Sequence, residues 1–287
     1  MLQASTIQLL RFPFSVLLMP VYFFALSFAY PVNWGPAGWL FIIIHALVYP
    51  ASNGYNSYMD ADTQAIGGVE NPMQPTRQLY AISLLLDALA VLACLPLGWP
   101  IVLGVVGYIV CSRLYSWRGL RLKRFAIPGY LVVVLNQGGL VFALTWAVAT
   151  GAMPWQVPLL PAVVAVCLIG GFYPITQVYQ HQQDAADGVQ TLSMLLGVRG
   201  TFLFCAAMYA LAFGLLGWYL FSHQQGYKWV LLQVFFAPVI FLFASWLFKV
   251  WQRPEAANYK ATMRMNWTAA LCTNLAFIIL VILNAIG

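Results

Sequence analysis

Acidic residues are scarce in this chain, and most of them gather in two short polar segments. Only seven of the 287 residues are Asp or Glu. Five of the seven follow two apolar stretches, in the clusters Asp60, Asp62 and Glu70, and Asp184 and Asp187. Asn56 precedes Asp60 by four residues, and Gln180 precedes Asp184 by four. On a helix each pair projects from one face, one turn apart, so each cluster presents a small surface rich in oxygen ligands.

These residue types favour a magnesium site over other metal sites. Mg²⁺ prefers carboxylate oxygens, amide oxygens and water, and it usually completes its octahedron with substrate phosphates. A zinc site is not indicated, because His181 is the one imidazole in the two clusters. The chemistry that the two clusters suit is therefore Mg²⁺-assisted binding of a diphosphate.

A basic loop is the second feature that suits a phosphate-bearing substrate. Residues 112 to 129 carry five cations between aromatic and aliphatic residues: Arg113, Arg118, Arg121, Lys123 and Arg124. Guanidinium and ammonium groups hold phosphate oxygens through charge-assisted hydrogen bonds. The alternative is that these cations only anchor the chain at a membrane surface, and it applies best to Arg113 and Arg118. Lys123 and Arg124 are the favoured phosphate ligands.

The elements that position these residues are membrane-spanning helices. Apolar residues make up 62% of the chain, charged residues only 7%, and the mean hydropathy is +0.82. Crossing about 30 Å of hydrocarbon takes about 20 apolar residues of helix, because every backbone polar group has to be satisfied within the segment. We predict a single all-α domain over residues 1–287 with about nine such helices, at 13–30, 37–56, 79–97, 99–116, 127–149, 158–180, 202–221, 228–250 and 267–285.

The distribution of cations predicts the orientation of these helices. With the N-terminus in the cytoplasm, twelve of the 13 Lys and Arg residues fall on the cytoplasmic side and only Lys228 falls outside. Both acidic clusters and the basic loop then face the cytoplasm. Topology and attraction to anionic lipid headgroups explain the net charge of +6, so nucleic acid is not an expected partner. The first helix lacks a cleavage site and is expected to remain in the protein.

The spacing of the two clusters also indicates an internal repeat. Asn56 and Gln180 lie 124 residues apart, and so do Asp60 and Asp184. Helices one to four and five to eight are therefore expected to be related units, which keep one orientation because each has an even number of spans. The two clusters would then meet across a pseudo-twofold axis normal to the bilayer and face one cavity.

The same residues resemble the motifs of the UbiA superfamily of intramembrane prenyltransferases over nearly the whole chain. Asn56 and Asp60 match the family's Asn-x-x-x-Asp-x-x-x-Asp motif, and Asp184 and Gly188 match its Asp-x-x-x-Asp-x-x-x-Gly motif. Other stretches similar to the family are Thr191-Leu192, Leu196-Gly197, Tyr115-Ser116 and Lys123-Arg124.

Two positions depart from the family's pattern. Gln64 stands where the first motif has its last acid, and Gln180 stands where the second has its first. Because Gln carries no negative charge, the number of metal ions is open, and Asp62 and Asp187 are candidates to replace the missing acids. Asp62 would reach the site only if the helix bent or ended just after Asp60. The altered pattern is similar to that of a divergent branch, represented by EboC-like proteins of bacterial secondary-metabolite clusters.

The resemblance implies a nine-helix bundle in a bacterial inner membrane, with a central cavity open laterally to lipid. It implies Mg²⁺-dependent transfer of a prenyl group from a polyprenyl diphosphate to a lipophilic acceptor, such as an activated aromatic carbon. The implied metal ligands are Asn56, Asp60, Asp62, Asp184 and Asp187. The implied catalytic residues are Asn56, Asp60, Asp184 and Lys123. The residues expected to bind the diphosphate substrate are Arg124, Arg77, Gln180 and Tyr115.

An allylic cation also has to be shielded from water, and aromatic faces stabilise its charge. The tyrosines near the motifs in sequence are Tyr55, Tyr58, Tyr115, Tyr173 and Tyr179. Candidate acceptor-binding amides are Asn136, Gln137 and Gln177. For both sets the alternative is ordinary helix packing and hydrogen bonding between helices.

Two other functions remain open. In an intramembrane terpene cyclase the ionised chain attacks itself and no external acceptor is needed. A transporter or lipid-binding protein would have kept the fold and lost full metal loading, and Asp87 in the third predicted helix would then be the residue of interest. Replacing Asp60 and Asp184 should abolish an enzyme, whereas Asp87→Asn should matter more to a proton-coupled carrier. For Asp87 itself, a protonated side chain hydrogen-bonded to another helix is the favoured interpretation.

Overall fold

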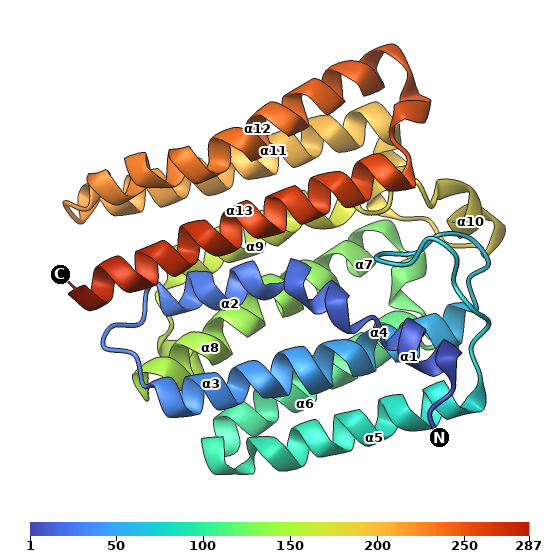
Figure 1. The fold of residues 1–287 in the computed structure, drawn as a ribbon, viewed down its shortest axis with the longest axis horizontal. Coiled ribbons are helices and arrows are strands. Elements are labelled where there is room, and N and C mark those ends of the chain that lie inside the picture. The colour runs from blue at the N-terminus through green and yellow to red at the C-terminus, as the bar shows by residue number, and fades with distance from the viewer. Residues whose placement is uncertain (287) are drawn as a thin grey trace.

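The computed structural model describes residues 1–286, and its regular structure is helical apart from an isolated bridge between Ile66 and Val69 (Figure 1). The α-helices are α1 (Ala4–Leu10), α2 (Met19–Leu26), α3 (Trp34–Ile42), α4 (Tyr49–Asp60), α5 (Arg77–Cys94), α6 (Trp99–Ser116), α7 (Ala126–Val133), α8 (Val141–Thr150), α9 (Leu159–Ile175), α10 (His181–Ala186), α11 (Leu192–Ser222), α12 (Gly226–Gln252) and α13 (Tyr259–Ile286).

Within the described residues, several of these helices join end to end into longer spans. Eight stretches are long and apolar enough to cross a membrane: Ala4–Leu26, Trp34–Asp60, Arg77–Leu97, Trp99–Ser116, Ala126–Thr150, Leu192–Ser222, Gly226–Gln252 and Tyr259–Ile286. The apolar helix α9, with 17 residues, occupies the sixth predicted position. The predicted all-α bundle of about nine membrane helices is confirmed.

Four boundaries differ from the prediction by five residues or more. The seventh and ninth segments begin at Leu192 and Tyr259, ahead of residues 202 and 267. The first span begins at Ala4 instead of residue 13, because the polar residues at its start are held by hydrogen bonds: the Gln3 amide donates to Gln78 Oε1 at 2.7 Å. The sixth segment stops being helical at Ile175 instead of residue 180. Pro174 lacks an N–H and removes one helical hydrogen bond, and the Thr176 hydroxyl donates to the Tyr173 carbonyl oxygen at 2.7 Å.

Two spans contain a π-helical turn. One of them, η2 (Ile43–Val48), joins α3 to α4, and the other, η5 (Val134–Leu140), joins α7 to α8. Such turns interrupt the regular rotation of side chains around a helix and are frequent at functional sites. The turn η5 carries Asn136 and Gln137, and both side chains line the polar cavity described below.

Glycines bring the helices around α9 into close contact. A Cβ atom on Gly138 would lie 2.8 Å from the Cα atom of Val166, and one on Gly171 would lie 3.2 Å from the carbonyl oxygen of Cys205. Small residues permit this close approach of helix backbones. As a result α9 is held tightly between η5 and α11.

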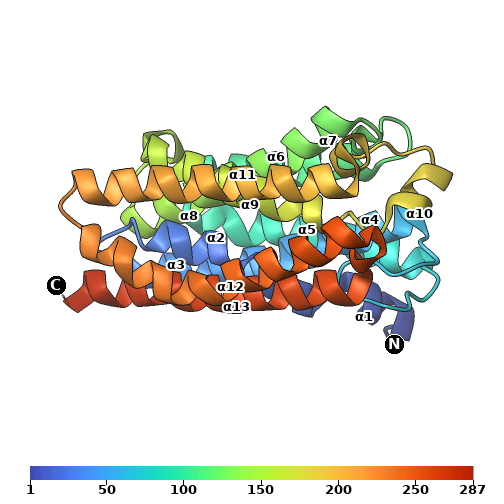
Figure 2. The same cartoon turned by 90° about the horizontal axis from the view of Figure 1, so that it is seen from above.

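The spans lie side by side, and their connections gather at the two ends of the bundle (Figure 2). The helices α1 and α10 lie at one end together with the end of α4, and the last described residues of α13 lie at the other. Large apolar side chains face outward, for example Phe241 at 78% exposed and Val234 at 68% on α12. Such a surface requires lipid as its solvent, so this is an integral membrane protein.

Candidate active site

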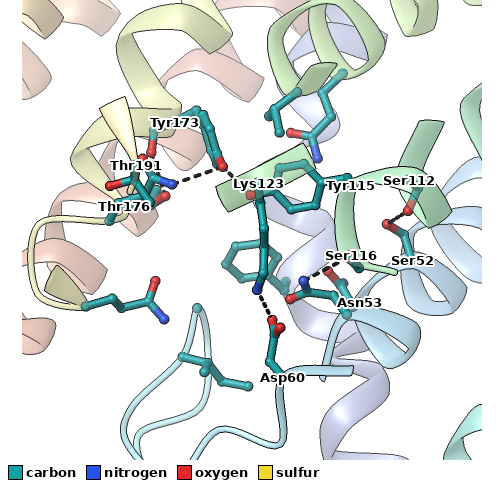
Figure 3. A pocket seen from close by; sticks show the side chains of 18 of the residues that line it. Ser52, Asn53, Asp60, Ser112, Tyr115, Ser116, Lys123, Tyr173, Thr176 and Thr191 are labelled. Atoms are coloured by element: carbon teal, nitrogen blue, oxygen red, sulfur yellow. Dashed lines mark hydrogen bonds and ion pairs between the residues drawn. The ribbon is translucent and has the colours of Figure 1, made fainter. Parts of the chain in front are cut away.

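A polar cavity of about 190 Å³ lies where the two acidic clusters meet (Figure 3). Its walls come from η1 (Phe12–Leu17), α4, α6, α7, η5, α9 and α10 and from residues that flank these helices. Seven of the predicted site residues line it: Asn56, Asp60, Asp62, Tyr115, Lys123, Gln180 and Asp184. The structure therefore brings together side chains that are widely separated in sequence.

The end of α4 positions the first cluster. Asn56 and Asp60 lie one turn apart on this helix, and the Asn56 side-chain amide donates to Ser116 Oγ on α6 at 3.0 Å. The helix ends at Asp60 because Ala61 adopts a left-handed conformation, with φ of 50°. This turn brings Asp62 to the cavity wall, where its carboxylate accepts a hydrogen bond from Gln183. Gln64, at the position of the motif's missing acid, is exposed and does not line the cavity.

The second cluster lies on a short helix instead of the end of a long one. Gln180 is the residue before α10, and its carbonyl oxygen accepts from the Asp184 amide at 2.9 Å, so the expected one-turn relation between them is kept. The Gln180 side chain donates to the Ala65 carbonyl oxygen at 3.5 Å, which links the loop after α4 to the turn before α10.

Cations from the loop after α6 meet the first cluster. The Lys123 ammonium forms an ion pair with Asp60, as Figure 3 shows. The Arg121 guanidinium lies 3.2 Å from the other carboxylate oxygen of Asp60 and also pairs with Asp187. The side chains of Asp60, Arg121 and Lys123 are 4%, 9% and 11% exposed, so solvent screens these pairs only weakly.

Three predicted site residues lie elsewhere. Arg124 is exposed, with its guanidinium stacked over the Phe125 ring at 4.6 Å. Arg77 is exposed at the first residue of α5. Asp187 lies outside the cavity, where its half-exposed carboxylate pairs with Arg121 and lies 3.5 Å from Arg118. The structure does not bring these three side chains to the cavity wall.

The local environment raises the pKa of two carboxyls in the cavity. Burial, together with the negative charge of Asp60, raises the pKa of Asp62 to about 6, against the opposing effect of Lys123. Burial also raises the pKa of Asp184 to about 6, again opposed by Lys123. The hydrogen bond from Arg121 instead lowers the pKa of Asp187. Asp62 and Asp184 therefore take up protons near pH 6, and a bound cation would favour their ionised forms, as it does for a metal ligand.

A matching family model supplies the identification. The UbiA prenyltransferase family model matches residues 16–270. The chain belongs to the UbiA prenyltransferase family. It is accordingly a membrane prenyltransferase. A comparison with curated proteins finds no match.

Solved structures of UbiA homologues share this fold at low sequence identity. The homologue from Archaeoglobus fulgidus bound to GPP and Mg²⁺ is 17% identical, with a TM-score of 0.69 over 97% of this chain and 99% of that chain. The homologue from Aeropyrum pernix K1 is also 17% identical, with a TM-score of 0.68 over 92% of this chain and 97% of that one. A structure described as digeranylgeranylglyceryl phosphate synthase in membranes is 17% identical, with a TM-score of 0.63 over 97% and 98%.

Two cations of this UbiA chain are site residues that the sequence analysis did not select. Arg121 belongs to the basic loop, but nothing in its spacing distinguishes it from Arg124. Arg11 enters the sequence analysis only through its contribution to topology. It is 9% exposed, lines the cavity, and donates to the carbonyl oxygens of Gly67 at 3.2 Å and Asn53 at 3.4 Å. These contacts fix the loop after α4 against the first span.

The inner wall of the UbiA cavity is built from tyrosines and amides. The hydroxyls of Tyr115 and Tyr173 are hydrogen-bonded to each other, and the Gln177 side chain donates to Tyr173 Oη at 3.0 Å (Figure 3). Asn136, Gln137 and Gln177, the candidate acceptor-binding amides, all line the cavity. Tyr179 lines it as well, whereas Tyr55 and Tyr58 stack near Tyr80 outside it.

A second, apolar cavity adjoins the polar one in this UbiA bundle. Its volume is about 290 Å³, and its walls come from η1 (Phe12–Leu17), α2, α9, α11, α12 and α13. Phe172 on α9 is the residue that lines both cavities. Because its side chain lines both, Phe172 forms a partition between the polar cavity and the apolar one.

Asp87 has a structural explanation within the UbiA bundle. Its carboxylate forms an ion pair with Arg113 of α6, and the Arg113 guanidinium also lies 4.1 Å from the ring centre of Tyr55. The side chains of Arg113 and Asp87 are 16% and 12% exposed. The predicted hydrogen bond of Asp87 to another helix is confirmed, but the partner is an arginine, so Asp87 belongs to an ion pair and is not the protonated side chain that was expected.

Proposed function

We propose that this UbiA-family enzyme transfers a prenyl group from a polyprenyl diphosphate to a lipophilic acceptor within the membrane, with Mg²⁺ as cofactor. The observation that carries the proposal is the convergence of Asp60, Asp62 and Asp184 with Lys123 and Arg11 on one cavity that adjoins an apolar one. The ligands of the Archaeoglobus fulgidus homologue, GPP and Mg²⁺, support it.

The donor set fits Mg²⁺. Asp60, Asp62, Asp184 and the amide oxygen of Asn56 are hard oxygen ligands on the wall of one cavity. Among residues 1–286, no group of three or more His, Cys, Asp or Glu is arranged to hold a metal ion alone. A metal site made of protein ligands alone is not required when diphosphate oxygens complete the coordination of the metal. When bound, the metal would neutralise charge on the diphosphate leaving group.

Three cations act on the same leaving group. Lys123 and Arg11 line the cavity, and Arg121 lies beside it as a partner of Asp60. They supply positive charge where the diphosphate develops negative charge. As the allylic carbon–oxygen bond breaks, its electron pair goes to the diphosphate oxygen. The acceptor then forms the new bond to the allylic carbon and releases a proton.

The two cavities divide the substrate between them. The apolar cavity receives the isoprenoid tail, and the rings of Tyr115 and Tyr173 exclude water from the allylic carbon and stabilise its positive charge. Asn136, Gln137 and Gln177 orient the acceptor. The acceptor's chemical class is a lipophile that presents a nucleophile, either an activated aromatic carbon or another nucleophilic atom.

We also propose the setting of this chemistry. The distribution of Lys and Arg supports a cytoplasmic N-terminus and cytoplasmic site loops in a bacterial inner membrane. The chain forms a single domain in which the spans up to α6 and those from α7 to α12 are related halves, each of which contributes one acidic cluster.

The test is diphosphate release from allylic prenyl diphosphates of several chain lengths by the purified protein, with Mg²⁺ or with chelator. We expect Mg²⁺-dependent release, and we expect Asp60→Asn and Asp184→Asn to lower it by at least about a hundredfold. Glu70→Gln, an exposed acid outside the cavity, is the matched control. Full activity of both cavity variants would refute the mechanism.

Mass spectrometry of the extracted lipids separates the related chemistries. Prenylated acceptor is the expected product. A cyclised hydrocarbon formed without an acceptor would instead identify a terpene cyclase. Absence of diphosphate release at every chain length, by folded protein supplied with membrane extract, would favour a binding or transport protein.

A further inference from the structure

A groove outside the polar and apolar cavities lies between α12 and α13 and joins two kinds of surface. It has a volume of about 640 Å³. Pro238, Phe241 and Leu242 of α12 form an apolar part. Lys249 near the end of α12, with Lys260 and Arg264 near the start of α13, forms a cationic part. We call this feature the cationic groove.

The cations of the groove are nearly free of partners. Within residues 1–286, Lys249 and Arg264 take part in no ion pair or side-chain hydrogen bond, and all three groove cations are exposed. Lys260 lies 3.8 Å from Glu70, but the two side chains are 83% and 54% exposed, so the pair is weak. Three positive charges therefore face a single, loosely held acid.

The position of Lys260 is unfavourable without an anion. Lys260 lies in the first turn of α13, at the positive end of the helix dipole, where cations are destabilising and anions are stabilising. Anchoring at the membrane surface explains a cation in this region, but it does not explain three cations gathered on one groove. An anionic group between them would satisfy both the side chains and the helix end.

The groove also has the dimensions of a lipid at the membrane surface. Phe241 precedes Lys249 by eight residues on α12, which corresponds to roughly 12 Å along a helix axis. Phe241 is 78% exposed, so the apolar part lies open to hydrocarbon while the cations lie at the level of headgroups. A phosphate held at the cations would leave its acyl chain to follow the apolar part.

We propose that the cationic groove is a binding site for an anionic phospholipid. Its phosphate lies between Lys249, Lys260 and Arg264, and one acyl chain packs along Pro238, Phe241 and Leu242. Charge complementarity selects the anionic lipid over a zwitterionic one, because the positive charge of a choline headgroup opposes the three cations. This site is separate from the proposed reaction centre and does not depend on it.

The test is lipid retention by the purified protein, measured by native mass spectrometry after titration with phosphatidylglycerol or phosphatidylcholine. We expect preferential retention of phosphatidylglycerol. A cation near a membrane surface contributes roughly a fivefold factor in affinity, so the double variant Lys249→Gln, Arg264→Gln should bind phosphatidylglycerol about 25-fold more weakly. Arg253→Gln, an exposed cation of the same connection outside the groove, should bind it as the unmodified protein does.

Three results would overturn the proposal. The first is equal retention of the two lipids, and the second is unchanged phosphatidylglycerol binding by the double variant. The third is competition by inorganic phosphate at a concentration equal to that of the lipid, because the apolar part would then contribute nothing. Elution volume and unfolding temperature, both measured in phosphatidylcholine, establish that the variants are folded. If the double variant does not fold, the single variants Lys249→Gln and Arg264→Gln replace it in the test.

Discussion

Arg121 and Arg124 lie three residues apart in one loop, yet their surroundings differ completely. Arg121 is buried against Asp60 and Asp187, whereas Arg124 is exposed on the ring of Phe125. Arg121 has a left-handed backbone, with φ of 52°, and its side chain reaches the carboxylate of Asp60. Spacing alone cannot reveal such a backbone conformation, so the sequence analysis favoured Arg124 over Arg121.

Replacing each arginine by glutamine measures this difference directly. We expect Arg121→Gln to lower kcat/KM for prenyl diphosphate about a hundredfold, because it removes positive charge from a site with little solvent. Arg124→Gln should stay within about twofold of the unmodified enzyme. Steady-state kinetics of the two variants under one condition is the measurement. Equal losses, or a larger loss for Arg124→Gln, would contradict the assignment.

The raised pKa values of Asp62 and Asp184, about 6 each, predict a pH dependence of Mg²⁺ affinity. Below pH 6 both carboxyls hold protons that Mg²⁺ has to displace, and above pH 6 they do not. The Mg²⁺ dissociation constant should therefore rise about tenfold per pH unit for each displaced proton as the pH falls from 6 to 5. Equilibrium Mg²⁺ titrations at pH 5, 6 and 7 test this.

The raised pKa values of the same two carboxyls also predict how the free energy of unfolding changes with pH. A carboxyl whose pKa rises on folding binds its proton more tightly in the folded state. Without Mg²⁺ these groups should stabilise the protein as the pH falls from 6 toward 4, the reverse of ordinary acid denaturation. A Mg²⁺ affinity that is constant from pH 7 to pH 5 would contradict the titration of both residues.

The contact between η5 and α9 fixes the wall of the cavity that carries Asn136 and Gln137. A Cβ atom on Gly138 would meet the backbone of Val166 at 2.8 Å and of Ala165 at 2.9 Å, and a backbone cannot yield as a side chain does. We expect Gly138→Ala to lower the free energy of unfolding by about 1–3 kcal/mol. Thermal unfolding in detergent is the measurement.

Gly107 on α6 is the matched control for this substitution. It has no neighbour within 4 Å of an added Cβ atom, so Gly107→Ala should leave stability unchanged or raise it by up to about 1 kcal/mol. Equal destabilisation by the two substitutions would show that close backbone approach is not the cause.

The partition at Phe172 predicts how α9 controls substrate choice. Shortening this side chain would connect the polar cavity with the apolar one. We expect Phe172→Ala to raise the ratio of kcat/KM for long over short prenyl diphosphates by at least about tenfold. Val239→Ala, on the wall of the apolar cavity only, should change the ratio much less. An unchanged ratio in Phe172→Ala would show that Phe172 does not control the choice between long and short prenyl diphosphates.

The sequence predicts the helical bundle better than it predicts the site. Nine apolar segments are predictable because each has to satisfy its own backbone in lipid. The convergence of Asp60 with Asp184 follows from their equal spacing and from topology. The contribution of Asp62 depends on the end of α4 at Ala61, and that of Arg11 depends on contacts with the loop at Gly67. Both are tertiary features, which periodicity does not encode.

The pairing of Asp60 with Lys123 and Arg121 has a thermodynamic consequence. Mg²⁺ that binds Asp60 has to compete with two cations, and a diphosphate offers those cations another partner. Each ligand should therefore bind more tightly when the other is present, by the same factor, in the range of about 5 to 150-fold. Titrating Mg²⁺ with and without an unreactive prenyl diphosphate analogue, corrected for their complex in solution, measures this factor. In Lys123→Gln one competitor is missing, so Mg²⁺ alone should bind more tightly and the cooperativity should shrink.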